Sequence, residues 1–163
     1  MTPLVVRTFP MPMATLVTVA GEVDIATAPA LRGHLLALPD RSMVVDMSEV
    51  GLLSAAGLSV LLDLQDRVTR TGARVVLTNA AVCVRRVLDL TGLDKIFAMA
   101  STVEDAVELV ASGLPAPTGQ PARLRAVLAG RPSRTAQHSL DPSRPSVSTV
   151  RAPELFVPNA SPR

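Results

Sequence analysis

The sequence predicts an α/β fold, a mixed sheet of about four to five strands covered by about four helices. Short β-prone runs alternate with apolar patterns of helical spacing up to residue 112 of the 163. This alternation favours parallel strands joined by right-handed helical crossovers. The hydrophobic fraction of 48% is enough to bury one core of ordinary size. One folded domain over residues 1–112 is therefore expected, followed by a tail over residues 113–163.

Two β-prone runs open the chain, Leu4–Thr8 and Ala14–Ala20. The prolines between them indicate a turn, so the runs are predicted to form a hairpin or two neighbouring strands. Leucines at helical spacing then predict a helix, for which Thr27 is the expected cap. Pro39 cannot continue a helix and is expected to follow its end.

The central stretch, Met43–Leu64, carries most of the functional information. It begins with a predicted buried strand, Met43–Asp46, and continues into a predicted polar turn over residues 47–51. Ser54 then precedes small residues and a helical apolar series, and its hydroxyl is the expected helix cap, worth roughly 1 kcal/mol. Because the first turn carries only small side chains, its amides and positive dipole end are open to a partner or an anion.

The remaining elements repeat the alternation. Arg74–Thr78 is a predicted strand, and a helix is expected from Asn79 to a C-cap at Gly92. Lys95–Met99 gives a last short strand. Ser101 has the spacing of a capping box before the final helix.

Residues that carry chemistry are few and scattered. His34 lies among leucines, His138 lies in the tail, and no group of residues has metal-ligand spacing. Cys83 is the single cysteine and is expected to be a buried structural thiol. Asp24 and Asp46 are expected at strand ends near the start of the central helix, where a role in turns is favoured over catalysis. No catalytic residue, metal or cofactor is predicted, and the chain is expected not to be an enzyme.

Charge is unevenly distributed along the chain. Residues 1–112 hold nine Lys and Arg against twelve Asp and Glu, whereas residues 113–163 hold seven Arg against two acids and nine of the fourteen prolines. The tail is predicted to be disordered, with a transient helical turn at Ala122–Ala129. It is interpreted as a solvated extension, with a weak electrostatic arm as the alternative. The apolar runs are too short for a membrane span and no signal segment is recognised, so a cytoplasmic protein is expected.

Four short motifs occur in an order and spacing that resemble the STAS domain of bacterial anti-sigma factor antagonists. They are Gly21-Glu22-Val23-Asp24, Val45-Asp46-Met47-Ser48, Gly57-Leu58 at the start of the central helix, and Thr91-Gly92-Leu93-Asp94. The resemblance covers roughly residues 3–112. It implies a single STAS domain and a surface, built around the central helix start, that binds another protein.

The resemblance also implies a set of partner-binding residues. In the family the helix start reads Asp-Ser-Ser-Gly-Leu or Asp-Ser-Thr-Gly-Leu, and the second hydroxyl is phosphorylated by a partner anti-sigma factor that is a serine kinase. Ala56 occupies this acceptor position here, and Ser54 is the main rival phosphorylation site. The implied partner-binding residues are Asp24, Asp46, Ser48, Ser54, Ala55, Ala56, Gly57, Leu58 and Ser59.

The function implied is that of an anti-sigma factor antagonist that binds an anti-sigma factor and so releases a sigma factor for transcription. Without the acceptor hydroxyl, the usual phosphorylation switch is expected to be absent. The alternative is a non-switching STAS scaffold or a module that senses a small ligand, because one fold serves several functions. Direct binding of nucleic acid through the arginine-rich tail is disfavoured, because the acidic excess of residues 1–112 repels phosphate.

Overall fold

The structure is a computed structural model that describes residues 2–113. Most of the predicted tail, including Ala122–Ala129 and His138, lies outside the described residues. The strands are β1 (Val5–Pro10), β2 (Thr15–Val23), β3 (Met43–Leu53), β4 (Val75–Thr78) and β5 (Ala98–Ala100). The helices are α1 (Ala28–Leu36), α2 (Ala55–Thr69), α3 (Val82–Thr91) and α4 (Val103–Ala111), with a 3-10 turn, η1, at Leu93–Lys95.

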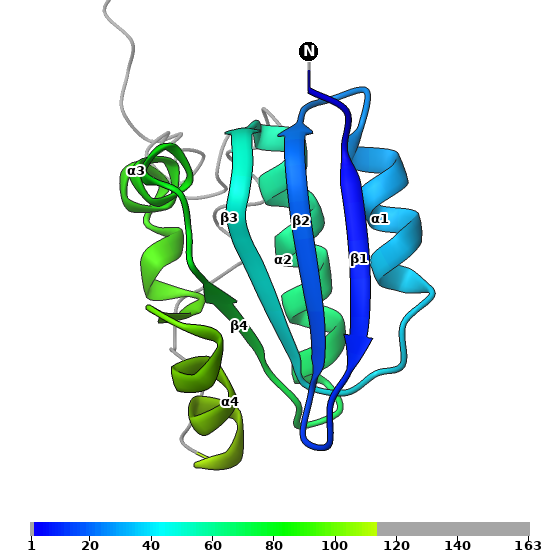
Figure 1. Cartoon of the computed structure of the whole chain (residues 1–163), viewed down its shortest axis with the longest axis vertical. Helices are drawn as coiled ribbons and strands as arrows, with labels where there is room; N and C mark the ends of the chain where they lie inside the picture. Colours follow the sequence, from blue (N-terminus) through cyan, green and yellow to red (C-terminus); the bar gives the residue numbers. More distant parts are fainter. Residues whose placement is uncertain (1, 114–163) are drawn as a thin grey trace, which may run out of the picture. The chain divides into compact units, whose positions relative to one another are not determined.

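The strands form one mixed sheet in the order β1-β2-β3-β4-β5. β1 and β2 pair as an antiparallel hairpin, and the remaining neighbours pair in parallel. Each parallel strand is added on the same side of the one before it. Right-handed crossovers that step in one direction place their helices on one face of the sheet. Figure 1 shows α1 and α2 together behind β1, β2 and β3. The predicted fold class is confirmed.

The two faces of the sheet are covered unequally. The main core lies under the crossover helices and includes residues such as Val45, Leu61 and Leu88. On the opposite face, α4 forms a smaller cluster around Ala106 with the buried residues Ala14, Val44 and Val76. The side chains of β1 that face this way remain largely exposed. The carboxyl ends of β2 and β3, after which α1 and α2 begin, lie at the same end of the sheet.

The predicted polar turn over residues 47–51 is wrong, because β3 continues through it to Leu53. Met47, Val50 and Leu53 are buried in the main core, and burial of these three side chains keeps the segment extended despite its polar residues. The parallel register with β2 shifts along this part of β3, which accommodates the irregular alternation of buried and exposed positions. Asp46 therefore does not lie at the end of a strand.

Several predicted helix starts are displaced by a few residues. α3 begins at Val82, since Asn79 adopts a φ of 49° and cannot start a helix. The cap of α4 is Thr102, whose hydroxyl accepts a hydrogen bond from the Asp105 amide at 3.1 Å, and not Ser101. The predicted strand at Lys95–Met99 also starts too early, because Lys95 belongs to the 3-10 turn.

Cys83 is exposed, so the prediction of a buried thiol is wrong. It lies in the first turn of α3, one residue after the exposed Val82. Its Sγ lies 3.4 Å from the carbonyl oxygen of Val50 and 3.5 Å from that of Gly51. These contacts bring the start of α3 beside the second half of β3.

Candidate partner-binding site

The start of α2 lies directly against the ends of β2 and β3. The amide of Ser54 donates a hydrogen bond of 2.8 Å to the carbonyl of Val23, the last residue of β2. Ser54 has extended backbone angles, and its Oγ accepts a hydrogen bond from the Gly57 amide at 3.5 Å. The predicted cap is therefore confirmed, although a bond of this length is weak.

Gly57 allows α2 to approach the sheet closely. A Cβ atom at this position would lie 2.6 Å from Cγ1 of Val23 and 2.7 Å from Cδ1 of Leu53. These distances are far shorter than ordinary contacts between carbon atoms, so a larger residue would push α2 away from the strand ends. The next residue, Leu58, is only 2% exposed and anchors the turn in the main core. Gly57 and Leu58 thus lie beneath the surface and position it.

The exposed part of the helix start is small and uncharged. Ala55 is exposed, whereas Ala56 is partly buried against the main core. Ser59 donates a hydrogen bond from its Oγ to the carbonyl of Ala55 at 3.0 Å, so its hydroxyl is engaged within the helix. The amides of the first turn have no intrahelical carbonyl to bond, and they carry the positive end of the helix dipole. An approaching protein would meet backbone donors and methyl groups here.

Asp24 closes the turn between β2 and α1. Its Oδ1 accepts hydrogen bonds from the amides of Ala26 and Thr27, each at 2.9 Å, and lies 3.0 Å from Oγ1 of Thr27. The Thr27 amide, followed by the Thr27 hydroxyl, holds the pKa of the Asp24 carboxyl below its usual value of 3.8. Thr27 is the first residue before α1, but its hydroxyl serves the turn and makes no cap bond to the helix. The Asp24 carboxylate therefore stabilises the turn that follows Val23, the residue to which Ser54 bonds. Its Oδ1 is already hydrogen-bonded within this turn.

Asp46 and Ser48 are not brought together with the helix start. Asp46 lies seven residues before the end of β3, a rise of about 20 Å along the strand. Its Oδ1 accepts a hydrogen bond from the Ser48 amide at 2.9 Å, and its Oδ2 accepts one from Nδ2 of Asn79 at 3.3 Å. Both residues line a hollow of about 250 Å³ that also includes Arg7 and Glu49. Asp46 and Ser48 are close to Ser54 in the sequence, so one site was expected. Because β3 is long, these two residues lie at a separate hollow, away from the start of α2.

The structure adds apolar residues that sequence reasoning assigned to no site. Ile25 is 83% exposed in the turn after β2, Val82 is 84% exposed at the start of α3, and Leu52 is 46% exposed near the end of β3. These residues follow or end β2 and β3 or begin the neighbouring α3, and we call Ile25, Leu52, Ser54, Ala55 and Val82 together the carboxyl-end surface. Ile25 directly follows Asp24, a residue type that favours turns. This position in a turn is the sequence feature that could have predicted an exposed side chain. Exposed apolar groups around an uncharged helix start suit a protein interface.

Among the described residues, no three His, Cys, Asp or Glu side chains gather as a metal site. None of the helices in residues 2–113 has the length and apolar character needed to cross a membrane.

Comparison with known protein families gives one clear match. The model of the STAS domain family matches residues 7–106, which is more than half of the chain. The chain belongs to the STAS domain family. The matched region contains all five residues of the carboxyl-end surface.

Several proteins to which the chain is similar are named anti-sigma factor antagonists. The chain is 33% identical over 99 residues to the anti-sigma-F factor antagonist RsfB of Mycobacterium tuberculosis, covering 59% of this chain and 80% of RsfB. It is 29% identical over 94 residues to the anti-sigma-B factor antagonist of Bacillus subtilis, covering 56% of this chain and 86% of that protein. Among solved structures, an anti-sigma factor antagonist from Mycobacterium paratuberculosis superposes with a TM-score of 0.61 at 30% identity, covering 67% of this STAS protein and 95% of that chain.

Proposed function

We propose that this STAS protein is an anti-sigma factor antagonist. It binds an anti-sigma factor of the serine kinase type through the helix start at residues 54–59, and binding releases a sigma factor for transcription. The relatives described above support the general role. The observation that carries the proposal for this chain is the uncharged start of α2, held against the strand ends and flanked by exposed apolar side chains.

The proposed interface is centred on the carboxyl-end surface. Ile25 and Val82 supply apolar area that is lost from water when a partner covers it, at roughly 25 cal/mol per Å². The unpaired amides of the first turn of α2 would donate to carbonyl or carboxylate oxygens of the partner. Gly57 and Leu58 are assigned positioning roles, because both are buried. Asp46 and Ser48 were also predicted to bind the partner. They line the hollow beside Arg7, so a partner would contact them if it also extended over this hollow.

We further propose that binding is not reversed by phosphorylation. Ala56 has no hydroxyl at the position that aligns with the family's acceptor, and the two nearby serines are already hydrogen-bonded. Phosphorylation of Ser54 would cost the cap of α2 and require the kinase to act two residues away from the usual position. Regulation would then rest on synthesis of the protein or on a competitor for the anti-sigma factor.

The proposal also covers the mode of action, the location and the domain bounds of the chain. The chain acts by binding and not by catalysis, in the cytoplasm, with residues 1–112 as the STAS domain and residues 113–163 as an appended tail. The family model matches residues 7–106, which lie within this proposed domain.

The direct test is calorimetry of the full chain with candidate anti-sigma kinases from the same genome, with and without ATP. Saturable binding that is unchanged by ATP is expected for the natural sequence. Ala56→Ser restores the acceptor, and its binding is expected to become sensitive to ATP. Absence of binding to every candidate would overturn the proposal and favour a scaffold or ligand-sensing module.

The switch is tested separately by mass spectrometry after incubation with the kinase and ATP. No phosphate is expected within residues 48–59 of the natural sequence, whereas Ala56→Ser is expected to gain one phosphate. Stoichiometric phosphate on Ser54 or Ser59 of the natural sequence would contradict the loss of the switch.

A further inference from the structure

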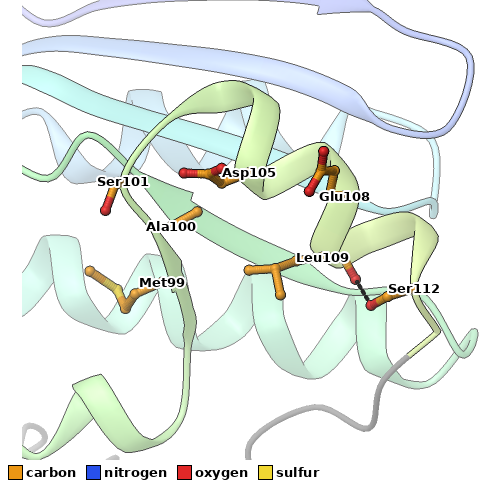
Figure 2. Close-up of a pocket in the computed structure, with 7 residues that line it drawn as sticks. All are labelled: Met99, Ala100, Ser101, Asp105, Glu108, Leu109 and Ser112. Atoms are coloured by element: carbon orange, nitrogen blue, oxygen red, sulfur yellow. Dashed lines mark hydrogen bonds between the residues drawn. The ribbon is translucent and has the colours of Figure 1, made fainter.

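A second surface of the molecule lies away from the start of α2. A hollow of about 440 Å³ is lined by β5 and α4, and Figure 2 shows their side chains around it. The lining combines apolar groups of Met99 and Leu109 with the carboxylates of Asp105 and Glu108. Within residues 2–113, neither carboxylate takes part in an ion pair. The hollow therefore offers apolar contact and two available negative charges.

The position of β5 gives a second reason to expect an occupant. Among the strands of residues 2–113, β5 lies at the edge of the sheet and has β4 as its single neighbour. An edge strand presents unpaired backbone donors and acceptors, and proteins commonly cover such edges with another segment. All three residues of β5 are only partly buried.

The chain itself leads from this hollow into an oppositely charged segment. Ser112 lines the hollow, and 51 residues follow it in the sequence. These residues carry seven Arg against two acids, whereas residues 1–112 carry an acidic excess. Ala122 lies nine residues after Gly113, a distance that an extended chain spans over about 30 Å. α4 is nine residues long, or about 14 Å, so the whole hollow is within reach.

One part of this sequence matches the lining of the hollow. In Ala122-Arg-Leu-Arg-Ala-Val-Leu-Ala129, the apolar residues Leu124, Val127 and Leu128 are three and four positions apart. A helical turn would place them on one face. Arg123 and Arg125 would then stand at the two borders of this face. The segment thus combines an apolar stripe with two cations, and the hollow combines the apolar groups of Met99 and Leu109 with two carboxylates on one side of α4.

We propose that residues 122–129 of this chain bind in the hollow between α4 and β5. Leu124 and Leu128 contact Met99 and Leu109, and the two arginines pair with Asp105 and Glu108. Each exposed ion pair is individually weak. The short connection compensates for this, because it gives the segment an effective concentration on the order of millimolar at the hollow.

Paramagnetic relaxation measurements on the full chain test this contact. Cys83→Ser removes the native cysteine, and Ala126→Cys then carries a spin label inside the segment. Amide signals of residues 99–109 are expected to lose intensity relative to the same sample with the label reduced. A label at Ser148→Cys in the same background is the control, because this position lies far along the tail from the proposed contact. Equal broadening from the two labels would overturn the proposal.

Charge reversal tests the pairing. Arg123→Glu/Arg125→Glu is expected to abolish the broadening caused by the label at residue 126, and adding Asp105→Lys/Glu108→Lys is expected to restore it. Arg144→Glu/Arg151→Glu changes the net charge equally and is expected to have no effect. A loss of broadening in this control would show a nonspecific electrostatic effect and overturn the assignment.

A mixed sample separates binding within one chain from binding between chains. Isotope-labelled chain without a spin label is combined with unlabelled chain that carries the label at residue 126. No broadening is expected in this sample if the segment binds its own domain. Broadening at residues 99–109 would identify a second copy as the occupant and overturn the proposal.

Discussion

Two helices begin at the same end of the sheet, and they begin in different ways. The junction before α1 is closed by Asp24, whose carboxylate accepts hydrogen bonds from its own turn. The junction before α2 is capped by the neutral Ser54 through a bond of 3.5 Å, and its position depends on the close packing of Gly57. At the first junction, the amides of the turn are hydrogen-bonded by the Asp24 side chain within the same turn. The second leaves an uncharged helix start open to another molecule, which is why the proposed interface is centred there.

Among changes at the two junctions, Gly57→Ala is expected to have the largest effect on stability. The added methyl group would lie within 2.7 Å of side chains from both β2 and β3, so the free energy of unfolding should fall by about 1–3 kcal/mol. Gly33→Ala in α1 is the matched control. A Cβ there has no atom within 4 Å, so helix propensity should raise the stability by about 0.5–1 kcal/mol. Denaturant unfolding followed by circular dichroism compares the two, and equal tolerance of both changes would contradict the packing argument.

The apolar border of the open junction is tested by Val82→Asp. Placing a charge at an exposed apolar contact should weaken binding of an anti-sigma factor by about tenfold or more. Leu90→Asp is the control on the same helix, since Leu90 is 78% exposed and lies at the opposite end of α3. Calorimetry with the same partner should find Leu90→Asp close to the natural sequence. Equal losses of affinity for both variants would show that Val82 does not belong to the interface.

A smaller effect is expected from removing the cap of α2. Ser54→Ala should lower the free energy of unfolding by about 0.5 kcal/mol, because the bond it removes is long. Thr102→Ala removes the cap of α4, whose hydrogen bond is 3.1 Å, and should cost about 1 kcal/mol. Denaturation midpoints of the two variants measure the difference. A larger loss for Ser54→Ala would show that the α2 junction depends on its cap as strongly as on packing.

The smallest effect is expected from the charge of Asp24. Its folded-state pKa lies below the usual 3.8, so its stabilising contribution is complete above that value and is lost as the pH falls through the folded pKa. Asp24→Asn should therefore reduce stability by a constant amount above about pH 5, and the difference should shrink at lower pH. Unfolding measured across this range checks the trend. A difference that does not change with pH would assign the effect to geometry and not to charge.

The sequence predicted the fold well because its signals are local and repeated. The alternation of strands and helices and the cap at Ser54 depend on neighbouring residues, and the structure confirms both. The end of β3 was predicted incorrectly because the polar residues around Ser48 resemble a turn. Burial of Met47 and Val50, which depends on helices distant in the sequence, keeps this segment extended.

The candidate site was harder to predict, because exposure depends on tertiary packing. Gly57 and Leu58 belong to the recognised motif, and only the structure shows that they are buried beneath the surface. Cys83 was predicted to be buried, yet both it and the neighbouring Val82 are exposed at the start of α3. Apolar residues of an interface cannot be distinguished from core residues by composition, so the border of the site appeared only with the fold.

The proposed function is tested most directly by displacement of a sigma factor. A complex of the anti-sigma kinase and its sigma factor is mixed with the full chain, and free sigma factor is measured by size-exclusion chromatography with and without ATP. Equal release in both conditions is expected for the natural sequence, and release that changes with ATP is expected for Ala56→Ser. Failure to release sigma factor, or release by the natural sequence that ATP abolishes, would contradict the proposed function.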